Sequence, residues 1–388
     1  MAAGKEIDPG TAPAPKQATW PGEPPRLREE HVDDLLGWCA EQRASDITIQ
    51  TDRPVYIEKD GQLYPVTVRP VDAADIAIML NRIYGAEALA KLASGVDLDL
   101  SYEIRTDRLS RVRFRVNITA ITSKGRDTGS ITLRTLPSLP PTMKDLGIEQ
   151  EIIDAWAPRQ GLVLVTGPTG SGKTTLLAAG NRMLIEREQG CGKMLTYEAP
   201  IEYVYDAIQS PRSLVAQSEI PRHLPSFAAG VRNALRRKPN IILVGEARDR
   251  ETVAAAVEAA QTGHAVYSTI HTTGVAATIR RMVSVFEPAE RSERAYAMME
   301  TLRLVVTQAL VPKRGGGRIG VREFMYFDDS VREKLLDMSS DRWTYEIQRI
   351  IPQYGRTMSE SAKRLFDQEL IDRRTYLTLA NGFSEGGS

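Results

Sequence analysis

The sequence has few of the residues that cross-link small secreted folds or hold structural metals. It contains only two cysteines, Cys39 and Cys191, and four histidines in 388 residues. The cysteines lie far apart and show no metal-ligand spacing, which argues against a disulfide scaffold and against a zinc site. No stretch approaches the about 18 apolar residues that span a bilayer, and the N-terminus has no signal-peptide pattern. We therefore expect a cytoplasmic protein.

An excess of charge of one sign is also lacking, because 50 Lys and Arg residues balance 50 Asp and Glu residues. Balanced charge gives no overall field that would attract nucleic acid or an acidic membrane. We expect no sequence-specific nucleic-acid binding and only peripheral association with a membrane. Hydrophobic residues make up 42% of the chain and charged residues 26%, as in ordinary globular proteins. A chain of this length is expected to form two or more folding units.

Proline-rich segments divide the chain. Residues 1–28 contain six prolines among small residues, a composition that predicts a disordered tail. Residues 29–136 are predicted to form a small α+β domain, with a hairpin turn that begins at Asp60 and a helix over 73–92. Residues 137–144 are the predicted linker, since three prolines among the first five of them break regular structure.

The region 145–380 is predicted to be an α/β domain. Short aliphatic runs alternate there with helical stretches, which is typical of a parallel sheet with helices on both faces. From about residue 287 the pattern becomes mostly helical, with one short strand-like piece over 318–327, so we expect a C-terminal helical appendage. The predicted strands of the sheet are 162–165, 193–197, 241–244 and 265–270.

A phosphate-binding loop is the strongest signal in the sequence. The segment GPTGSGKTT fits the pattern G-x-x-x-x-G-K-[ST] and lies between an apolar strand and a predicted helix. Its backbone N–H groups and the helix N-terminus are expected to surround the β-phosphate of ATP. Lys173 is expected to reach the β and γ phosphates, and the Thr174 hydroxyl to ligate Mg²⁺. The predicted nucleotide-binding residues are Gly167, Pro168, Thr169, Gly170, Ser171, Gly172, Lys173, Thr174 and Thr175.

Two acids follow strands at the edge where parallel sheets bind ligands. Glu198, in TYEAP, is a candidate general base that polarises the water attacking the γ-phosphate; the alternative is a carboxylate that caps the loop beside Pro200. Glu246 ends the aliphatic run NIILVGE. Because Gly245 precedes it and no Asp is available there, Glu246 is predicted to orient water or to hold Mg²⁺ through water, rather than to be an ordinary surface carboxylate.

Basic side chains supply further candidates. His271 ends the strand in TGHAVYSTIHTT and is expected at the same edge as the phosphate loop, whereas helix capping is enough to explain His264. Arg232 and Arg236 lie at the end of a predicted helix. There they either complement the helix dipole or, from the same or a neighbouring subunit, stabilise charge on the transferred phosphate.

Arginines also alternate along the last strands of the first domain. The alternation in RFRVN places Arg113 and Arg115 on one face, and Arg134 lies on the next strand. This face either meets a nucleotide held by a neighbouring domain or subunit or is simply solvated.

Four segments together resemble a known family. GPTGSGKTT, TYEAPIEYVY, NALRRKPNIILVGEARD and TGHAVYSTIHTT are similar, in this order, to the Walker A, Asp, Walker B and His boxes of the secretion ATPases, which include PilT-like pilus retraction motors and type IV secretion traffic ATPases. ASDITIQ, RFRVN, SEIPRHLP and VRNALRRKP more narrowly resemble the DotB-like ATPases of type IVB secretion systems and the TraJ-type conjugation ATPases. The resemblance covers roughly residues 30–380.

The resemblance implies an N-terminal PAS-like α+β domain, a RecA-like P-loop NTPase motor domain with C-terminal helices, and a hexameric ring with ATP held between the two domains. It implies that Glu198 and Glu246 serve catalysis, that His271 senses the nucleotide, and that arginines of the first domain help to complete the site. The Asp box usually reads E-D-P in this family, whereas Ala199 follows Glu198 here. Glu198 is therefore the sole acid of that pair.

The leading hypothesis is a hexameric, Mg²⁺-dependent ATPase that drives substrate transfer or assembly in a type IVB secretion or conjugative DNA transfer system. Its expected partners are copies of itself and inner-membrane components of that system, which would recruit it to the inner face of the cytoplasmic membrane. A type IV pilus retraction motor is the first alternative, and an ATP-binding scaffold that barely hydrolyses is the second. A helicase-like motor acting on DNA predicts a basic channel, to which the balanced charge gives little support.

Overall fold

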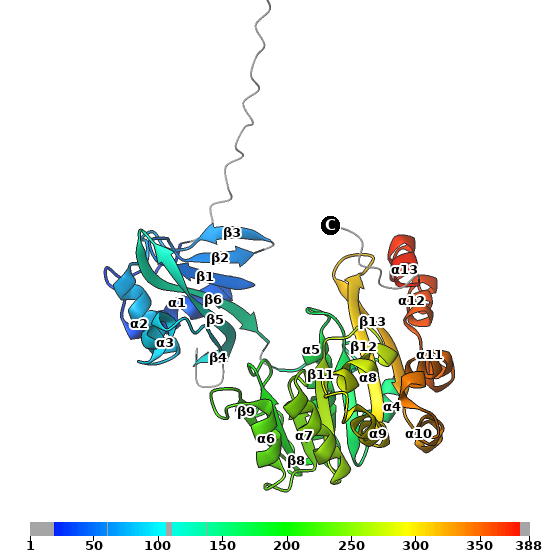
Figure 1. Cartoon of the computed structure of the whole chain (residues 1–388). Coiled ribbons are helices and arrows are strands. Elements are labelled where there is room, and N and C mark those ends of the chain that lie inside the picture. The colour runs from blue at the N-terminus through cyan, green and yellow to red at the C-terminus, as the bar shows by residue number, and fades with distance from the viewer. Residues whose placement is uncertain (1–18, 60, 106–110, 138, 381–388) are drawn as a thin grey trace, which may run out of the picture. The chain divides into compact units, whose positions relative to one another are not determined.

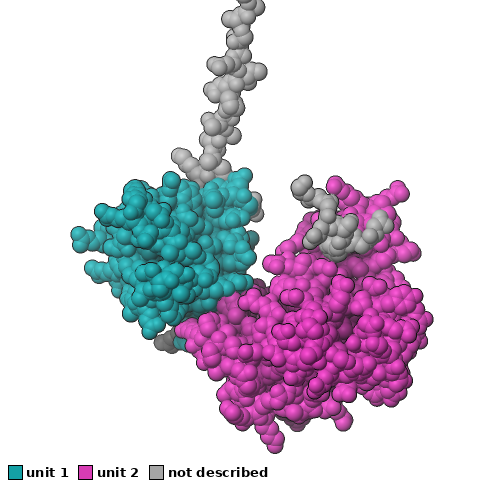
Figure 2. Space-filling view, viewed as in Figure 1, with its two compact units in different colours: residues 1–136 teal, residues 137–388 magenta. Residues whose placement is uncertain are grey.

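The computed structural model describes residues 19–59, 61–105, 111–137 and 139–380. The chain divides between Leu136 and Pro137 into two compact units, coloured teal and magenta in Figure 2. Each unit has its own sheet (Figure 1). Each also has its own buried hydrophobic residues.

The first unit contains a six-stranded antiparallel sheet with helices against it. Its strands lie in the order β3 (Gln62–Pro65), β2 (Tyr56–Lys59), β1 (Asp46–Gln50), β6 (Arg126–Leu136), β5 (Arg111–Ser123) and β4 (Leu98–Arg105). Its helices are α1 (Glu29–Glu41), α2 (Ala73–Ile83) and α3 (Ala88–Ala93).

One face of this sheet forms the core of the unit. Strand residues alternate between the two faces, so Ile47 and Ile49 of β1 are both buried in the core while their neighbours are more exposed. The expected hairpin between β2 and β3 is present, with Lys59 opposite Gln62 and Gly61 at a φ of 75°. Asp60 lies outside the described residues.

Two expectations for this unit are wrong. The single helix expected over 73–92 is divided into α2 and α3, because Gly85 between them adopts a φ of 120° that interrupts the helix. The disordered tail was expected to reach residue 28, but the Trp20 side chain is buried and its backbone N–H donates to the Val66 carbonyl at 2.7 Å. An indole provides enough apolar surface to hold this segment in the core. Residues 1–18 of the expected tail lie outside the described residues.

The second unit contains an eight-stranded mixed sheet. The strands from β12 to β9 are parallel, and β13 and β14 are antiparallel additions at one side. The order is β14 (Gly355–Arg356), β13 (Arg318–Tyr326), β12 (Leu302–Pro312), β7 (Gly161–Thr166), β11 (Ala265–Ile270), β10 (Ile241–Val244), β8 (Gly192–Glu198) and β9 (Ser213–Glu219).

Helices cover both faces of this sheet, as the all-buried strand β7 requires. One core contains Leu162 and Leu164 of β7, and the other contains Val163 and Val165. On the first face lie α6 (Phe227–Ala234), α7 (Arg250–Gln261), α8 (Val275–Ser284), α9 (Arg291–Thr301), α10 (Asp329–Leu336) and α11 (Trp343–Tyr354). On the second lie α4 (Gln150–Ala155) and α5 (Lys173–Glu186), while α12 (Met358–Asp367) and α13 (Arg373–Ala380) form a smaller core with β13.

The expectation of a mostly helical region from about residue 287 is wrong in part. β12 lies directly beside β7, so this region supplies two full strands of the sheet in addition to its helices. A fully buried strand has no alternating pattern, and its apolar run cannot be told from a buried helix by periodicity.

In the described part of the chain, no helix has the length and apolar character needed to cross a membrane.

Candidate active site

The predicted phosphate loop connects the end of β7 to the start of α5. Gly167 has a φ of 143°, and a Cβ atom there would lie 2.2 Å from the Gln308 carbonyl oxygen of the adjacent strand β12. Gly172 has a φ of 82° and precedes the first helical residue, Lys173. Only glycine meets both demands, because the backbone is left-handed at Gly172 and packed against backbone at Gly167. The sequence motif therefore forms the loop that it predicts.

Lys173 extends across this loop rather than into solvent. Its ammonium donates to the carbonyl oxygens of Gly167 at 3.0 Å and of Pro168 at 2.9 Å. The side chain is buried, and this burial lowers the pKa of Lys173, an effect that the carboxylates of Glu246 and Glu202 oppose. A buried ammonium surrounded by carbonyl groups is suited to exchange these weak partners for phosphate oxygens.

The ends of β10 and β11 are joined by side-chain and backbone hydrogen bonds. Thr269 Oγ1 donates to the Gly245 carbonyl, and the Ala247 N–H donates to the Thr269 carbonyl at 3.0 Å. These bonds hold the turn after β10 against β11, so Glu246 and His271 leave neighbouring strands at the same edge. This is the edge at which parallel sheets bind ligands.

Lys173, His271 and Glu246 lie in successive contact at this edge. The Lys173 Nζ atom is 3.4 Å from His271 Nδ1, and His271 Nε2 is 3.6 Å from a Glu246 carboxylate oxygen. Partial burial and then the Lys173 charge lower the pKa of His271, while Glu246 opposes the shift. A neutral imidazole between an ammonium and a carboxylate can respond to charge placed on either side of it.

Glu198 ends β8 and is held in a fixed orientation. Its Oε1 atom accepts hydrogen bonds from Thr196 Oγ1 at 2.6 Å and from Gln217 Nε2 at 3.0 Å, and the residue is 6% exposed. A Cβ atom on Gly245 would lie 3.3 Å from the Glu198 Cα atom, so the two acid-bearing turns are adjacent. The structure thus brings Glu198 to the edge of the sheet where Glu246 and His271 lie.

The loop fits the phosphates of a nucleotide. The Ser171 hydroxyl is buried and has no hydrogen-bond partner among the described residues, an arrangement that a bound phosphate oxygen would satisfy. Thr174 lies in the first turn of α5 and is partly exposed, so its hydroxyl is accessible to a metal ion beside the phosphates. Thr175 Oγ1 contacts the Tyr203 hydroxyl at 3.2 Å, while Pro168, Thr169 and Gly170 are exposed.

Two arginines predicted for this site lie elsewhere within the chain. Arg232 is in the last turn of α6, and Arg236 follows that helix before β10 begins. Both are exposed at the amino-terminal edge of the parallel strands, opposite to the edge with Glu246. They do not contact the phosphate loop of their own chain. A role in phosphate transfer at the site of a neighbouring subunit stays a prediction.

His264 behaves as a cap, with Nδ1 3.0 Å from the Ala259 carbonyl oxygen at the end of α7.

The arginines of the first unit share one face of its sheet. Arg115 lies opposite Arg134 in the register of β5 and β6, and Arg113 is two residues away on β5. Arg113 is almost fully buried with Nε 3.5 Å from Glu103, Arg115 contacts Asp99 at 3.0 Å, and Arg134 contacts Asp46 at 3.0 Å. Arg113 and Arg115 lie on one face, as the alternation in the sequence predicts. A role of these arginines in nucleotide binding remains a prediction.

Sequence reasoning missed the glutamines that support the site. Gln217 lies on β9, which was not predicted, and orients Glu198. Gln308 lies on β12, which was expected to be helical, and donates to the Ser171 carbonyl of the loop at 2.7 Å. The one signal available was a Thr-Gln pair inside the apolar run LRLVVTQALV, where buried polar side chains need partners.

A parallel sheet in which one strand ends in a glycine-rich loop and a helix, with acids at the carboxyl ends of two other parallel strands, defines a RecA-like P-loop nucleotide-binding domain. This confirms the predicted fold class. The chain matches the family described as "Type II/IV secretion system protein" over residues 27–368, and it belongs to that family.

Individual relatives narrow the comparison. The type IV pilus retraction ATPase PilT of Pseudomonas aeruginosa is 36% identical over 301 residues, 78% of this chain and 84% of that protein. The X-ray structure of the Legionella pneumophila ATPase DotB is 46% identical, with a TM-score of 0.90, and the match covers 94% of this chain and 99% of that chain. The crystal structure of the pilus retraction motor PilT with bound ADP is 29% identical with a TM-score of 0.78, covering 91% and 97% of the two chains. The resemblance to PilT-like and DotB-like ATPases is confirmed.

Proposed function

We propose that this protein hydrolyses ATP with Mg²⁺ and, as a hexamer of identical subunits, drives substrate transfer or assembly in a type IVB secretion or conjugative system. Membership of a family of secretion and pilus ATPases supports the general activity. The identity of 46% to the Legionella pneumophila ATPase DotB over nearly the whole chain supports the narrower assignment.

The contact series from Lys173 through His271 to Glu246 is the observation that carries the proposal. Lys173 contacts His271 from the phosphate loop, and Glu246 lies on the far side of His271 at the same sheet edge. The proposed role of Lys173 is to bind the phosphates of ATP. Loss of the γ-phosphate changes the charge next to Lys173, and His271 is placed to pass this change to Glu246. Glu198 is the proposed general base, since its two hydrogen-bond donors aim the carboxylate.

Mg²⁺ bound with the nucleotide would supply positive charge to the β and γ phosphates. In the described part of the chain, no cluster of three or more His, Cys, Asp or Glu side chains could hold a metal ion alone. Thr174 would therefore hold the ion together with the phosphates, and Glu246 would contact it through water. Ala199 leaves Glu198 as the one acid of its pair, so the proposed hydrolysis depends on Glu198 and Glu246.

Assembly is the second part of the proposal. Arg232 and Arg236 are exposed at the edge away from their own phosphate loop, so we assign them to contacts with a neighbouring subunit. Arg113, Arg115 and Arg134 are assigned to completing a nucleotide site in the assembled ring. The proposed docking partners are inner-membrane components of the secretion machine, with recruitment from the cytoplasm to the membrane surface.

The test is phosphate release from ATP and Mg²⁺ by the purified protein, compared with Lys173→Ala. Loss of a charge-assisted contact to phosphate should weaken nucleotide affinity by about 10-fold to 100-fold and remove turnover. Lys193→Ala is the matched control, because Lys193 bonds the Arg237 carbonyl at the opposite sheet edge. Unchanged nucleotide affinity in Lys173→Ala would contradict the assignment of the loop.

A type IV pilus retraction motor is the second candidate. The 36% identity to PilT of Pseudomonas aeruginosa supports it, and the chemistry of the site would be the same. Capture of partners from the native cell with the Glu246→Gln variant separates the two candidate functions. Retained components of a secretion machine would support the first candidate, and retained components of a pilus would support the second.

A further inference from the structure

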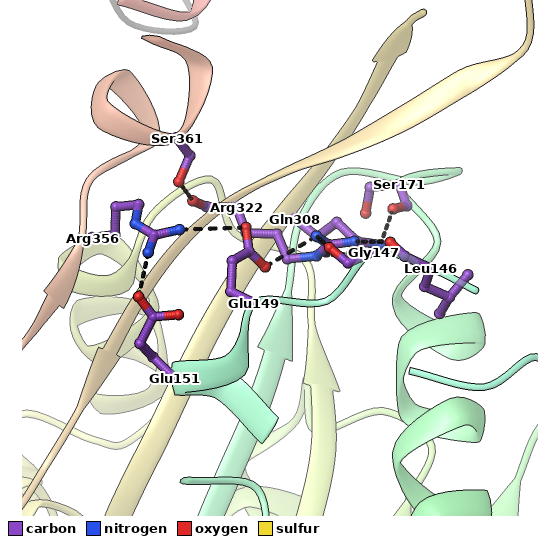
Figure 3. Close-up of polar contacts among 9 residues, drawn as sticks. All are labelled: Leu146, Gly147, Glu149, Glu151, Ser171, Gln308, Arg322, Arg356 and Ser361. Carbon is purple, nitrogen blue, oxygen red and sulfur yellow. Dashed lines mark hydrogen bonds and ion pairs between the residues drawn. The ribbon is translucent and has the colours of Figure 1, made fainter. Parts of the chain in front are cut away.

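A series of buried hydrogen bonds runs from the phosphate loop through Gln308 to Arg322 (Figure 3). It lies on the side of β7 away from the strands that lead to His271 and Glu246. β12 lies beside β7, and Gln308 lies opposite Arg322 in the pairing of β12 with β13. The Gln308 amide uses both of its ends: Nε2 donates to the Ser171 carbonyl at 2.7 Å, and Oε1 accepts from Arg322 Nε at 2.7 Å. One side chain thus joins the phosphate loop to a buried guanidinium.

Arg322 continues the series to the segment that follows the linker. Its Nη1 atom lies 3.1 Å from the Glu149 carboxylate and 3.3 Å from the Gly147 carbonyl oxygen, and Nη2 donates to the Leu146 carbonyl at 3.2 Å. The side chain is 4% exposed, so its charge is almost fully removed from water. The planar fork of arginine can serve all these partners at once, and a lysine ammonium cannot.

The two side chains have little room to move. A Cβ atom on Gly172 would lie 2.9 Å from Gln308 Nε2, and one on Gly320 would lie 2.5 Å from Arg322 Nη2. Close-packed groups transmit displacements instead of absorbing them. A shift of the Ser171 carbonyl, as the loop closes on phosphate, must therefore move Gln308 and Arg322 or break their hydrogen bonds.

A second connection reaches the linker from the helix of the loop. Arg182, on α5, donates to the Pro140 carbonyl at 2.7 Å and is held by Glu186 at 2.7 Å. The region 140–149 is thus bonded to α5 at its start and to Arg322 near its end. The chain runs from this region through Pro137 directly into β6 of the first unit.

Strand β14 contacts the end of region 140–149, and helix α12 contacts Arg322. Arg356 forms ion pairs with Glu149 and Glu151, and its guanidinium lies over the Phe324 ring at 5.2 Å. Ser361 Oγ donates to the Arg322 backbone carbonyl. These contacts brace region 140–149 locally, which makes Arg356 a useful control.

We propose that Gln308 and Arg322 are positioning residues that couple the phosphate loop to region 140–149, so that nucleotide bound at the loop alters the order of the chain joining the two units. The inference rests on the proposed function only in requiring that the loop binds a nucleotide. Neither residue touches the reacting atoms.

The test measures amide hydrogen exchange of residues 142–149 in the full-length protein, with and without ADP and Mg²⁺. The amides of Leu146, Gly147 and Ile148 bond to carbonyls within this turn and report its opening. In the wild type, ADP should change their exchange by about 2-fold to 10-fold, the equilibrium effect of one hydrogen bond. Gln308→Met keeps the length of the side chain but cannot bond Ser171 and Arg322. It should still bind a fluorescent ADP analogue and should lose the exchange response.

Arg356→Gln is the matched control, because it removes contacts to Glu149 and Glu151 and leaves the series from Ser171 to Arg322 intact; it should keep the response. The proposal is overturned if the wild type binds ADP without a change at 142–149, if Gln308→Met responds as the wild type does, or if Arg356→Gln loses the response equally. Failure of the wild type to bind ADP would overturn the proposed function as well. If Gln308→Met does not fold, Arg322→Lys applies the same test, since it keeps the charge and loses the fork.

Discussion

The two sheets of this protein place their charged side chains in different ways. In the first unit the strands are antiparallel, and charges pair across one face: Arg115 with Asp99, and Arg134 with Asp46. In the second unit the central strands are parallel and buried on both faces, so polar chemistry gathers where strands end, at Glu198, Glu246 and His271. Charge on the first sheet covers a face, whereas charge on the second is concentrated at an edge.

From this difference we predict which substitutions should affect activity and which should affect folding. A carboxylate at the edge of the parallel sheet is positioned by the ends of strands that form regardless of it, so its loss should affect turnover more than stability. An arginine on the face of the antiparallel sheet is paired within its own unit. Its loss should therefore lower the free energy of unfolding of that unit before it affects turnover.

Glu198→Gln should lower kcat by about 100-fold or more and leave nucleotide affinity nearly unchanged, because a neutral amide cannot accept a proton from water. Glu251→Gln is the matched control, because Glu251 is an exposed residue in the first turn of α7, and it should turn over as the wild type does. Steady-state phosphate release and binding of a fluorescent ATP analogue measure the two effects. If kcat of Glu198→Gln stays within about threefold of the wild type, Glu198 is not the general base.

Arg113→Met should lower the free energy of unfolding of the first unit by about 1 to 3 kcal/mol. Arg113 is 3% exposed, and Glu103 beside it would lose a buried partner. Arg134→Met is the control on the same face; its side chain is 67% exposed, so its pair with Asp46 should contribute less than about 1 kcal/mol. Denaturant unfolding of both variants gives the comparison. Equal losses of unfolding free energy in the two variants would show that burial does not determine how much each arginine contributes to stability.

His271 should titrate below its ordinary pKa of 6.5 in the nucleotide-free protein, because partial burial and Lys173 both disfavour its charged form. Since the folded pKa lies below the unfolded one, unfolding takes up a proton, and this contribution to stability is lost as the pH falls below 6.5. An NMR titration of the imidazole, assigned with His271→Gln, measures the midpoint. A midpoint above 6.5 would mean that Glu246 dominates over Lys173.

Local sequence patterns were enough to predict the loop and the strand-ending acids. The motif at Lys173 includes its own strand and helix, and Glu198, Glu246 and His271 each follow an aliphatic run. Gln308 could not be predicted in the same way. Its importance depends on β12 lying beside β7, a pairing between residues more than a hundred positions apart. Its neighbour Arg322 looks like a surface charge in the sequence and becomes buried only when β13 pairs with β12.

The same distinction explains the errors in the first unit. Trp20 lies among prolines that predict disorder, and only the finished fold provides the Val66 carbonyl and the core that hold it. Gly85 interrupts a helix whose apolar periodicity continues on both sides, so a pattern of apolar residues alone predicts one helix. Tertiary contacts order the segment around Trp20 although its composition predicts disorder. The backbone freedom of Gly85 ends a helix that the apolar pattern alone would continue.

Glu246 is proposed to act in ATP hydrolysis at the edge of the parallel sheet, and a paired assay on Glu246→Gln tests this role most directly. Equilibrium binding of ATP and release of phosphate are measured on the same preparation with Mg²⁺. This variant should bind ATP with an affinity close to that of the wild type and release phosphate at least about 100-fold more slowly. Equal rates of phosphate release by the variant and the wild type would contradict this role of Glu246.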